Sequence, residues 1–136
     1  MANSFTTQIL EEGQRNAIVK LTAVLDTSDL ALTNAVQMSD INQGGLGFTP
    51  TQARIDHIDY SISDQLEVQL LWGATTDVVI LPLAGRGRLM FWNFGGLTNN
   101  AGAGKTGTIK IKTTGWTSGT QVFSVVVELV KQGQNL

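Results

Sequence analysis

The sequence has 136 residues, of which 42% are hydrophobic and 15% charged, with 15 glycines and no cysteine. This length is enough to bury one core, so we expect a single domain over residues 1–136. The formal net charge of −2 excludes a broad basic field for nucleic acid, the lack of cysteine excludes disulfides and thiolate metal sites, and no segment approaches the ~20 apolar residues of a membrane span. Because an isolated soluble domain usually has more surface charge, the low charged fraction indicates a surface that other protein subunits cover.

The N-terminal third is predicted to form two strands followed by a long loop. Residues 5–10 are rich in β-forming side chains, and residues 17–25 place an unbroken series of apolar residues on one face of an alternating segment. Residues 26–52 show no comparable alternation, so we expect a loop there with at most a turn or two of helix.

The next predicted strand, residues 54–62, contains an irregularity. Its apolar row includes Ile58, but Ile55 is out of phase with that row. A β-bulge adds one residue to a strand and reverses the alternation, so the pattern predicts a bulge near Asp56 and His57.

Five further strands are predicted in the C-terminal half, at residues 66–72, 78–83, 88–94, 109–112 and 121–131. Pro82 lacks an N–H and predicts a strand end or sheet edge, whereas residues 121–131 are apolar on both faces and predict a central strand. About eight strands separated by turn residues predict an all-β fold, an antiparallel two-sheet sandwich of jelly-roll type with one long loop.

The two chain ends are candidate contact segments. Residues 1–12 can form either a strand of the domain or an N-terminal arm, and residues 132–136 are a second candidate. An extended arm can add to an exposed sheet edge of a neighbouring subunit through main-chain hydrogen bonds.

Three features resemble catalytic or nucleotide-binding motifs, and each is incomplete. Residues 102–106 end like a phosphate-binding loop but precede a predicted strand instead of a helix. Asp26 follows a strand as in aspartic proteases, although Ser28 replaces the required glycine, and turn hydrogen bonds are the simpler explanation. His57 has no second histidine or cysteine to form a metal site with it. We therefore predict no catalytic, cofactor-binding or metal-binding residues.

Aromatic and basic residues indicate possible contact sites. Trp72 is predicted to lie in the core, while the sequence does not assign Trp92 or Trp116 to core or surface. The candidate protein–protein contacts are Phe5, Thr7 and Ile9 in the first strand, Arg86 and Arg88 in a glycine-flanked basic turn, and Asn99 and Asn100 in the loop over residues 95–104.

Four stretches, residues 54–64, 82–88, 94–97 and 128–133, resemble small virion proteins of tailed bacteriophages. In size and strand content the chain is similar to the capsid cement or decoration proteins of that group. The resemblance implies a jelly-roll domain that binds the major capsid protein as a homo-oligomer, a dimer or a trimer. It also implies assembly in the host cytoplasm and a final location on the virion surface.

Three functions remain open from the sequence. A structural cement protein explains the low charge and the glycine-rich loops, and a tail, neck or head-fibre protein is a close alternative. A carbohydrate-binding β-sandwich module would explain the tryptophans, whose rings can stack on sugar faces. An enzyme would depend on Asp26 or His57, and we do not expect one.

Overall fold

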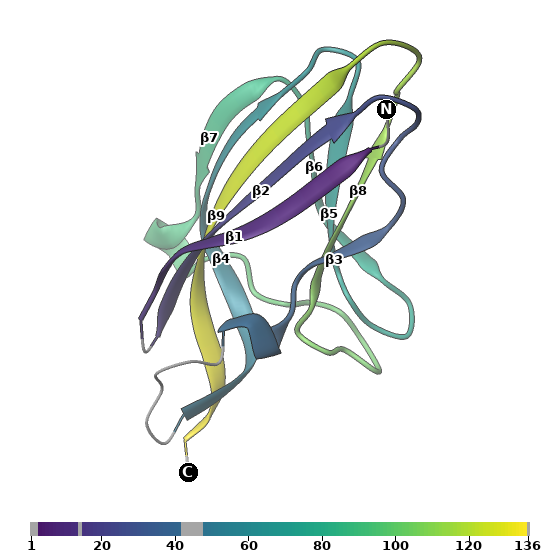
Figure 1. Cartoon of the computed structure of the whole chain (residues 1–136). Helices are drawn as coiled ribbons and strands as arrows, with labels where there is room; N and C mark the ends of the chain where they lie inside the picture. Colours follow the sequence, from purple (N-terminus) through teal and green to yellow (C-terminus); the bar gives the residue numbers. More distant parts are fainter. Residues whose placement is uncertain (1–2, 14, 42–47, 136) are drawn as a thin grey trace.

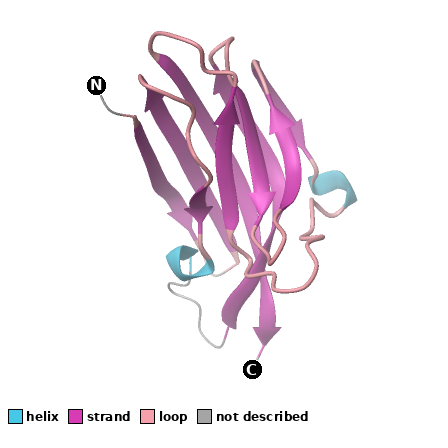
Figure 2. Cartoon of the chain, turned by 90° about the vertical axis from the view of Figure 1, so that its right-hand side faces the viewer, coloured by secondary structure: helices cyan, strands magenta, loops and turns pink. Residues whose placement is uncertain are grey.

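The computed structural model describes residues 3–13, 15–41 and 48–135, which form nine strands in two antiparallel sheets (Figure 1). The strands are β1 (Ser4–Glu12), β2 (Asn16–Leu25), β3 (Thr33–Val36), β4 (Phe48–Ile62), β5 (Glu67–Trp72), β6 (Val78–Leu83), β7 (Arg86–Met90), β8 (Ile109–Thr114) and β9 (Gln121–Asn135). Two short 3-10 turns, η1 (Met38–Ile41) and η2 (Trp92–Phe94), lie on opposite sides of the strands (Figure 2). No helix within the described ranges is long and apolar enough to cross a membrane.

The strand order defines a jelly roll. One sheet has the order β1-β2-β9-β4-β7 and the other β3-β8-β5-β6. Within them β2 pairs with β9, β3 with β8, β4 with β7 and β5 with β6, each pair antiparallel. This nested pairing divides eight strands into two four-stranded sheets, as in a double Greek key, and β1 extends the first sheet. The predicted fold class is therefore confirmed.

The core lies between the two sheets and is built from their inward rows. Alternate residues of β2 and β9, among them Leu21 and Val127, are fully buried and face Ile109 and Ile111 of β8. Trp72 at the end of β5 is 1% exposed, which confirms its predicted place in the core. Truncation of such a buried tryptophan to alanine costs about 3–5 kcal/mol. The central position of β9 and the edge position of β6, with its Pro82, are also confirmed.

Two predicted boundaries are wrong. Residues 26–52 are not one loop, because they contain β3, η1 and the start of β4. β3 has only four residues, too few to show an alternating pattern. The strand predicted at residues 88–94 runs from Arg86 to Met90. Phe91 N–H still donates to the Asp56 carbonyl of β4, but the Phe91 carbonyl accepts from the N–H groups of Phe94 and Gly96, so the chain turns into η2.

Both predicted arms are paired within this chain over the part that the structure describes, with residues 1–2 and 136 lying outside the described residues. β1 pairs with β2 from Ser4 opposite Val24 to Glu12 opposite Ala17, and residues 132–135 pair with the start of β4. The Phe5 ring packs 6.4 Å from that of Phe123. Residues 4–12 are therefore an edge strand of the sandwich.

Candidate interaction surface

The turn between β6 and β7 fixes the position of two exposed arginines. Gly85 adopts a φ of 73°, and its carbonyl accepts a hydrogen bond of 2.8 Å from the N–H of Ile62. Only a residue without a Cβ adopts such a φ readily. β7 then pairs antiparallel with β4, which places Arg86 opposite Ser61 and Arg88 opposite Asp59. The basic turn predicted from the sequence thus lies at one edge of the five-stranded sheet.

Arg88 belongs to a row of polar groups on the outer face of this sheet. Its Nε donates to Asp59 Oδ1 over 2.8 Å, and His57 Nδ1 lies 2.8 Å from Glu128 Oε2 on the neighbouring β9. His57 Nε2 is 3.5 Å from Asp59 Oδ1. Arg88 and Asp59 form a partly exposed ion pair, and His57 shares a hydrogen bond with Glu128, so these polar groups link three strands. His57 therefore bonds to a carboxylate of its own sheet through Nδ1.

The predicted bulge in β4 positions the segment that follows β7. The β4–β9 register shifts between Ile55 and His57, which confirms the bulge. The Asp56 carbonyl accepts a 2.8 Å hydrogen bond from Phe91 N–H, and Ile55 forms a two-bond bridge with Leu97. Residues 91–97 are consequently held against β4 at both ends.

A close glycine contact completes this attachment. Gly96 has a φ of 83°, and its N–H donates to the Phe91 carbonyl over 2.8 Å. A Cβ at this position would lie 2.5 Å from Asp56 Oδ1 and 3.1 Å from the Ile55 carbonyl oxygen. Such distances are too short for a side chain, so the tight turn requires glycine.

The end of β7 and the anchored segment that follows it present three apolar side chains to solvent. Met90, Trp92 and Phe94 are 54%, 62% and 66% exposed, and together they are named here the β7–η2 patch. Phe91 between them packs against the core and touches the Phe94 ring edge-on at 6.1 Å. A group of large solvent-exposed apolar side chains marks an interaction site more often than an isolated exposed apolar side chain does.

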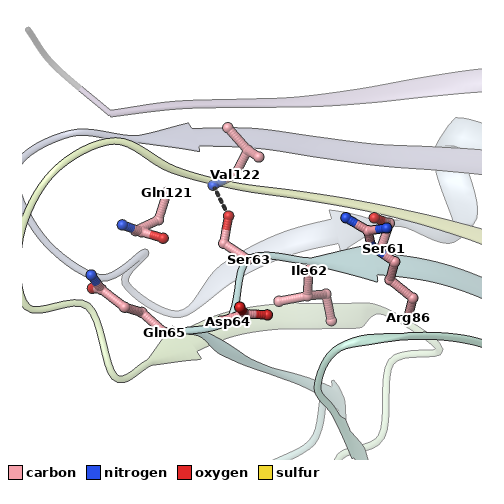
Figure 3. Close-up of a pocket in the computed structure, with 8 residues that line it drawn as sticks. All are labelled: Ser61, Ile62, Ser63, Asp64, Gln65, Arg86, Gln121 and Val122. Atoms are coloured by element: carbon pink, nitrogen blue, oxygen red, sulfur yellow. Dashed lines mark hydrogen bonds between the residues drawn. The ribbon is translucent and has the colours of Figure 1, made fainter.

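A shallow hollow of about 430 Å³ lies beside the basic turn (Figure 3). It is lined by Ser61, Ile62, Ser63, Asp64, Gln65, Arg86, Gln121 and Val122. Ser63 Oγ accepts a hydrogen bond from Val122 N–H, and Gln65 Oε1 accepts one from Thr117 N–H, so part of the lining is already paired. Gln121 Nε2 likewise donates to the Ser118 carbonyl. The other polar groups of the lining are the Asp64 carboxylate, the Arg86 guanidinium and the Ser61 hydroxyl, which suit hydrogen bonding to a polar chain segment.

The seven predicted contact residues fall in three places. Phe5, Thr7 and Ile9 lie in β1 at the edge of the sheet opposite to β7, and only Ile9 of the three is exposed. Arg86 and Arg88 are both exposed in β7. Asn99 and Asn100 lie in the loop before β8.

The two asparagines differ in how far they are free to make contacts. Asn99 uses its side chain within the chain, donating to Gln52 Oε1 and accepting from Ala101 N–H. Asn100 is exposed and lines a second hollow of about 230 Å³ with Leu97 and Ile80. Asn99 therefore has a structural role, and its role as a contact stays a prediction.

Sequence reasoning did not identify Met90 and Phe94 and left Trp92 unassigned. All three belong to a short apolar run that resembles part of a strand, and nothing in that run distinguishes exposed from buried positions. The sequence signal that could have indicated a turn here is the pair Gly95–Gly96, which ends η2 and directs the chain away from the β4–β7 ladder.

The other motif-like residues have structural roles. Asp26 N–H donates to Asn3 Oδ1, and Asp26 Oδ1 accepts from Thr120 Oγ1 over 2.6 Å, in agreement with a turn after β2. The glycine-rich loop at 102–106 leads into β8, a strand, as predicted. Trp116 is half-buried and donates its Nε1–H to the Gly119 carbonyl.

No protein-family model matches the sequence, and the search of curated proteins finds no match. Among solved structures, the chain is similar to an uncharacterised conserved protein with a double-stranded β-helix domain from Klebsiella pneumoniae, at 8% sequence identity and a TM-score of 0.34. The alignment covers 95% of this chain and 85% of that one.

Proposed function

We propose that this protein is a structural component of a virus particle that binds the outside of a tailed-phage capsid and stabilises the contacts between capsomers. The observation that favours a binding role is the β7–η2 patch, three large exposed apolar side chains at the end of β7 and in η2, where hydrogen bonds attach the chain to β4. A rigid surface loses little conformational entropy on binding, so more of its contact energy is available for affinity. The capsid as partner follows from the sequence resemblance.

The proposed mechanism is mechanical. A capsid filled with DNA is under outward pressure, and a domain that spans two capsomers adds buried surface that must be exposed again before they separate. Many copies over the shell act together, so contacts of modest strength suffice. Arg86 and Arg88 on the same strand can pair with carboxylates at the rim of such an interface.

The exposed area of Trp92 determines how much binding free energy this side chain can contribute. At 62% exposure it has about 150 Å² to bury, which corresponds to about 4 kcal/mol at ~25 cal/mol/Å² if it is fully covered. Truncation of an interfacial tryptophan of this kind usually costs at least about 2 kcal/mol. We therefore expect the Trp92→Ala variant to bind capsids roughly 30- to 1000-fold more weakly.

The test is co-sedimentation of Trp92→Ala and Phe94→Ala with purified capsids. Leu32→Ala is the matched control, because Leu32 is 47% exposed but lies in the segment between β2 and β3, outside the patch. Binding lost in the patch variants and retained in Leu32→Ala fits the proposal. Equal binding by all variants would show that another surface is used.

A carbohydrate-binding module is the second candidate, because the exposed Trp92 and Phe94 rings are available to stack on sugars. A sugar-dependent change in tryptophan fluorescence that disappears in Trp92→Phe would favour this function. A tail, neck or head-fibre location would instead give binding to those virion parts and none to capsids.

A further inference from the structure

The two sheets have four edges, and they differ in how well they are protected against pairing with another chain. β3 has only four residues, β6 contains Pro82, and β7 contains Gly87 between two arginines. Short length, proline and exposed charge all oppose the addition of a further strand. β1 has nine residues and lacks these features along most of its length.

The unprotected part of β1 is residues 4–10. This run contains no charged residue, glycine or proline, and the two glutamates of the strand, Glu11 and Glu12, come after it. Ile9 and Leu10 are 36% and 48% exposed. An uncharged edge strand with exposed apolar side chains is a template for main-chain pairing.

β1 is firmly held in place on its inner side. Thr7 Oγ1 donates to the Ala35 carbonyl in β3 over 2.9 Å, and Lys131 Nζ lies 2.9 Å from Glu12 Oε2. β1 also pairs with β2 in unbroken register from Ser4 to Ile9, and the register shifts only between Ile9 and Glu11, beyond the residues proposed to pair. The open edge is thus presented by a fixed strand, which reduces the entropy lost when another strand is added.

The side-chain order of β1 matches a second copy of itself. In an antiparallel pair around a twofold axis through Thr7, Phe5 faces Ile9 of the other copy, and Thr6 faces its Gln8. Apolar inner residues then meet apolar ones, and polar outer residues meet polar ones. A pair centred on Thr6 would instead place Ile9 opposite Asn3, whose side chain already binds the Asp26 N–H. A pair centred on Gln8 would place Phe5 opposite Glu11.

We infer that the open edge of β1 is a self-association site, where two copies pair antiparallel through residues 5–9 to form one continuous sheet across a dimer. This surface lies at the opposite edge of the sheet from β7, so it leaves the β7–η2 patch available. The inference therefore does not depend on the proposed capsid binding, and either can fail without the other.

The test is the mass of the full-length protein in solution, measured by sedimentation velocity over a range of concentrations. Thr6 and Gln8 are partly or fully exposed on the outer row, which is where the twofold register brings them together. Thr6→Lys/Gln8→Lys places lysines opposite lysines, and we expect the dissociation constant of the dimer to rise at least tenfold. Thr6→Lys/Gln8→Glu is the matched control: each lysine then faces a glutamate, and dimerisation is expected to recover.

A single cysteine tests the register independently. The chain has no cysteine, so Thr7→Cys introduces a single thiol per copy, and residues opposite each other in a sheet are close enough for a disulfide. Oxidation should give a covalent dimer for Thr7→Cys but little for Thr6→Cys. A monomeric wild-type protein at about 100 μM, a Lys/Lys variant as dimeric as the wild type, or equal cross-linking of the two cysteine variants would overturn the inference.

Discussion

Lys131 provides the sharpest test of how β1 is attached to the sandwich. Its side chain is 2% exposed, and its Nζ lies 2.9 Å from Glu12 Oε2 and donates to the Gly13 carbonyl over 2.8 Å. Lys131→Met keeps the aliphatic volume but leaves the Glu12 carboxylate without this cation. Removal of one partner of a buried ion pair costs about 3–5 kcal/mol, and we expect about 3 kcal/mol because Glu12 retains some exposure.

Urea unfolding measures this effect directly. With a slope of about 2 kcal/mol per molar, the loss lowers the midpoint of Lys131→Met by about 1.5 M. Lys131→Met/Glu12→Gln also neutralises the carboxylate that faced Lys131, so its midpoint should lie above that of the single variant. A Lys131→Met midpoint within about 0.2 M of wild type, or a double variant less stable than the single one, would refute the reasoning.

Two further predictions concern the turns. Gly96→Ala should lower the free energy of unfolding by at least about 1 kcal/mol in urea. Gly102→Ala is the control and should not, because a Cβ at Gly102 would meet nothing within 4 Å. Equal effects of the two substitutions would contradict the role of Gly96. The Ala74 N–H and, second, Lys110 lower the pKa of Asp77 below its usual 3.8. The ionised form thus stabilises the fold above about pH 4, and this contribution is lost as the pH falls through the lowered pKa. Between about pH 6 and pH 3 the melting temperature of Asp77→Asn should therefore fall less steeply than that of the wild type. Parallel profiles of melting temperature against pH would contradict this.

Much of the fold is predictable because strand alternation is a local property of the sequence. The row from Ala17 to Leu25 is buried at every second position, and the out-of-phase Ile55 correctly indicates the bulge. β3 was not predictable, since four residues contain too little pattern and its position depends on pairing with β8. Local pattern therefore identifies long strands, and tertiary pairing determines the short one.

The candidate site was predictable only in part. The basic turn around Arg86 follows from glycine and charge in the sequence, and the structure places it at a sheet edge. The exposure of Trp92 and Phe94 does not follow, because it depends on hydrogen bonds between residues 91–97 and the bulge, which are distant in sequence. An apolar run alone predicts a strand whose side chains are buried in the core.

The central claim is that this chain attaches to the outside of a tailed-phage capsid, and co-sedimentation with purified, DNA-filled capsids tests it most directly. We expect the wild-type protein to pellet with capsids and to saturate at a fixed ratio to the major capsid protein. Protein that stays in the supernatant at every concentration, or that pellets without saturating, would contradict the account.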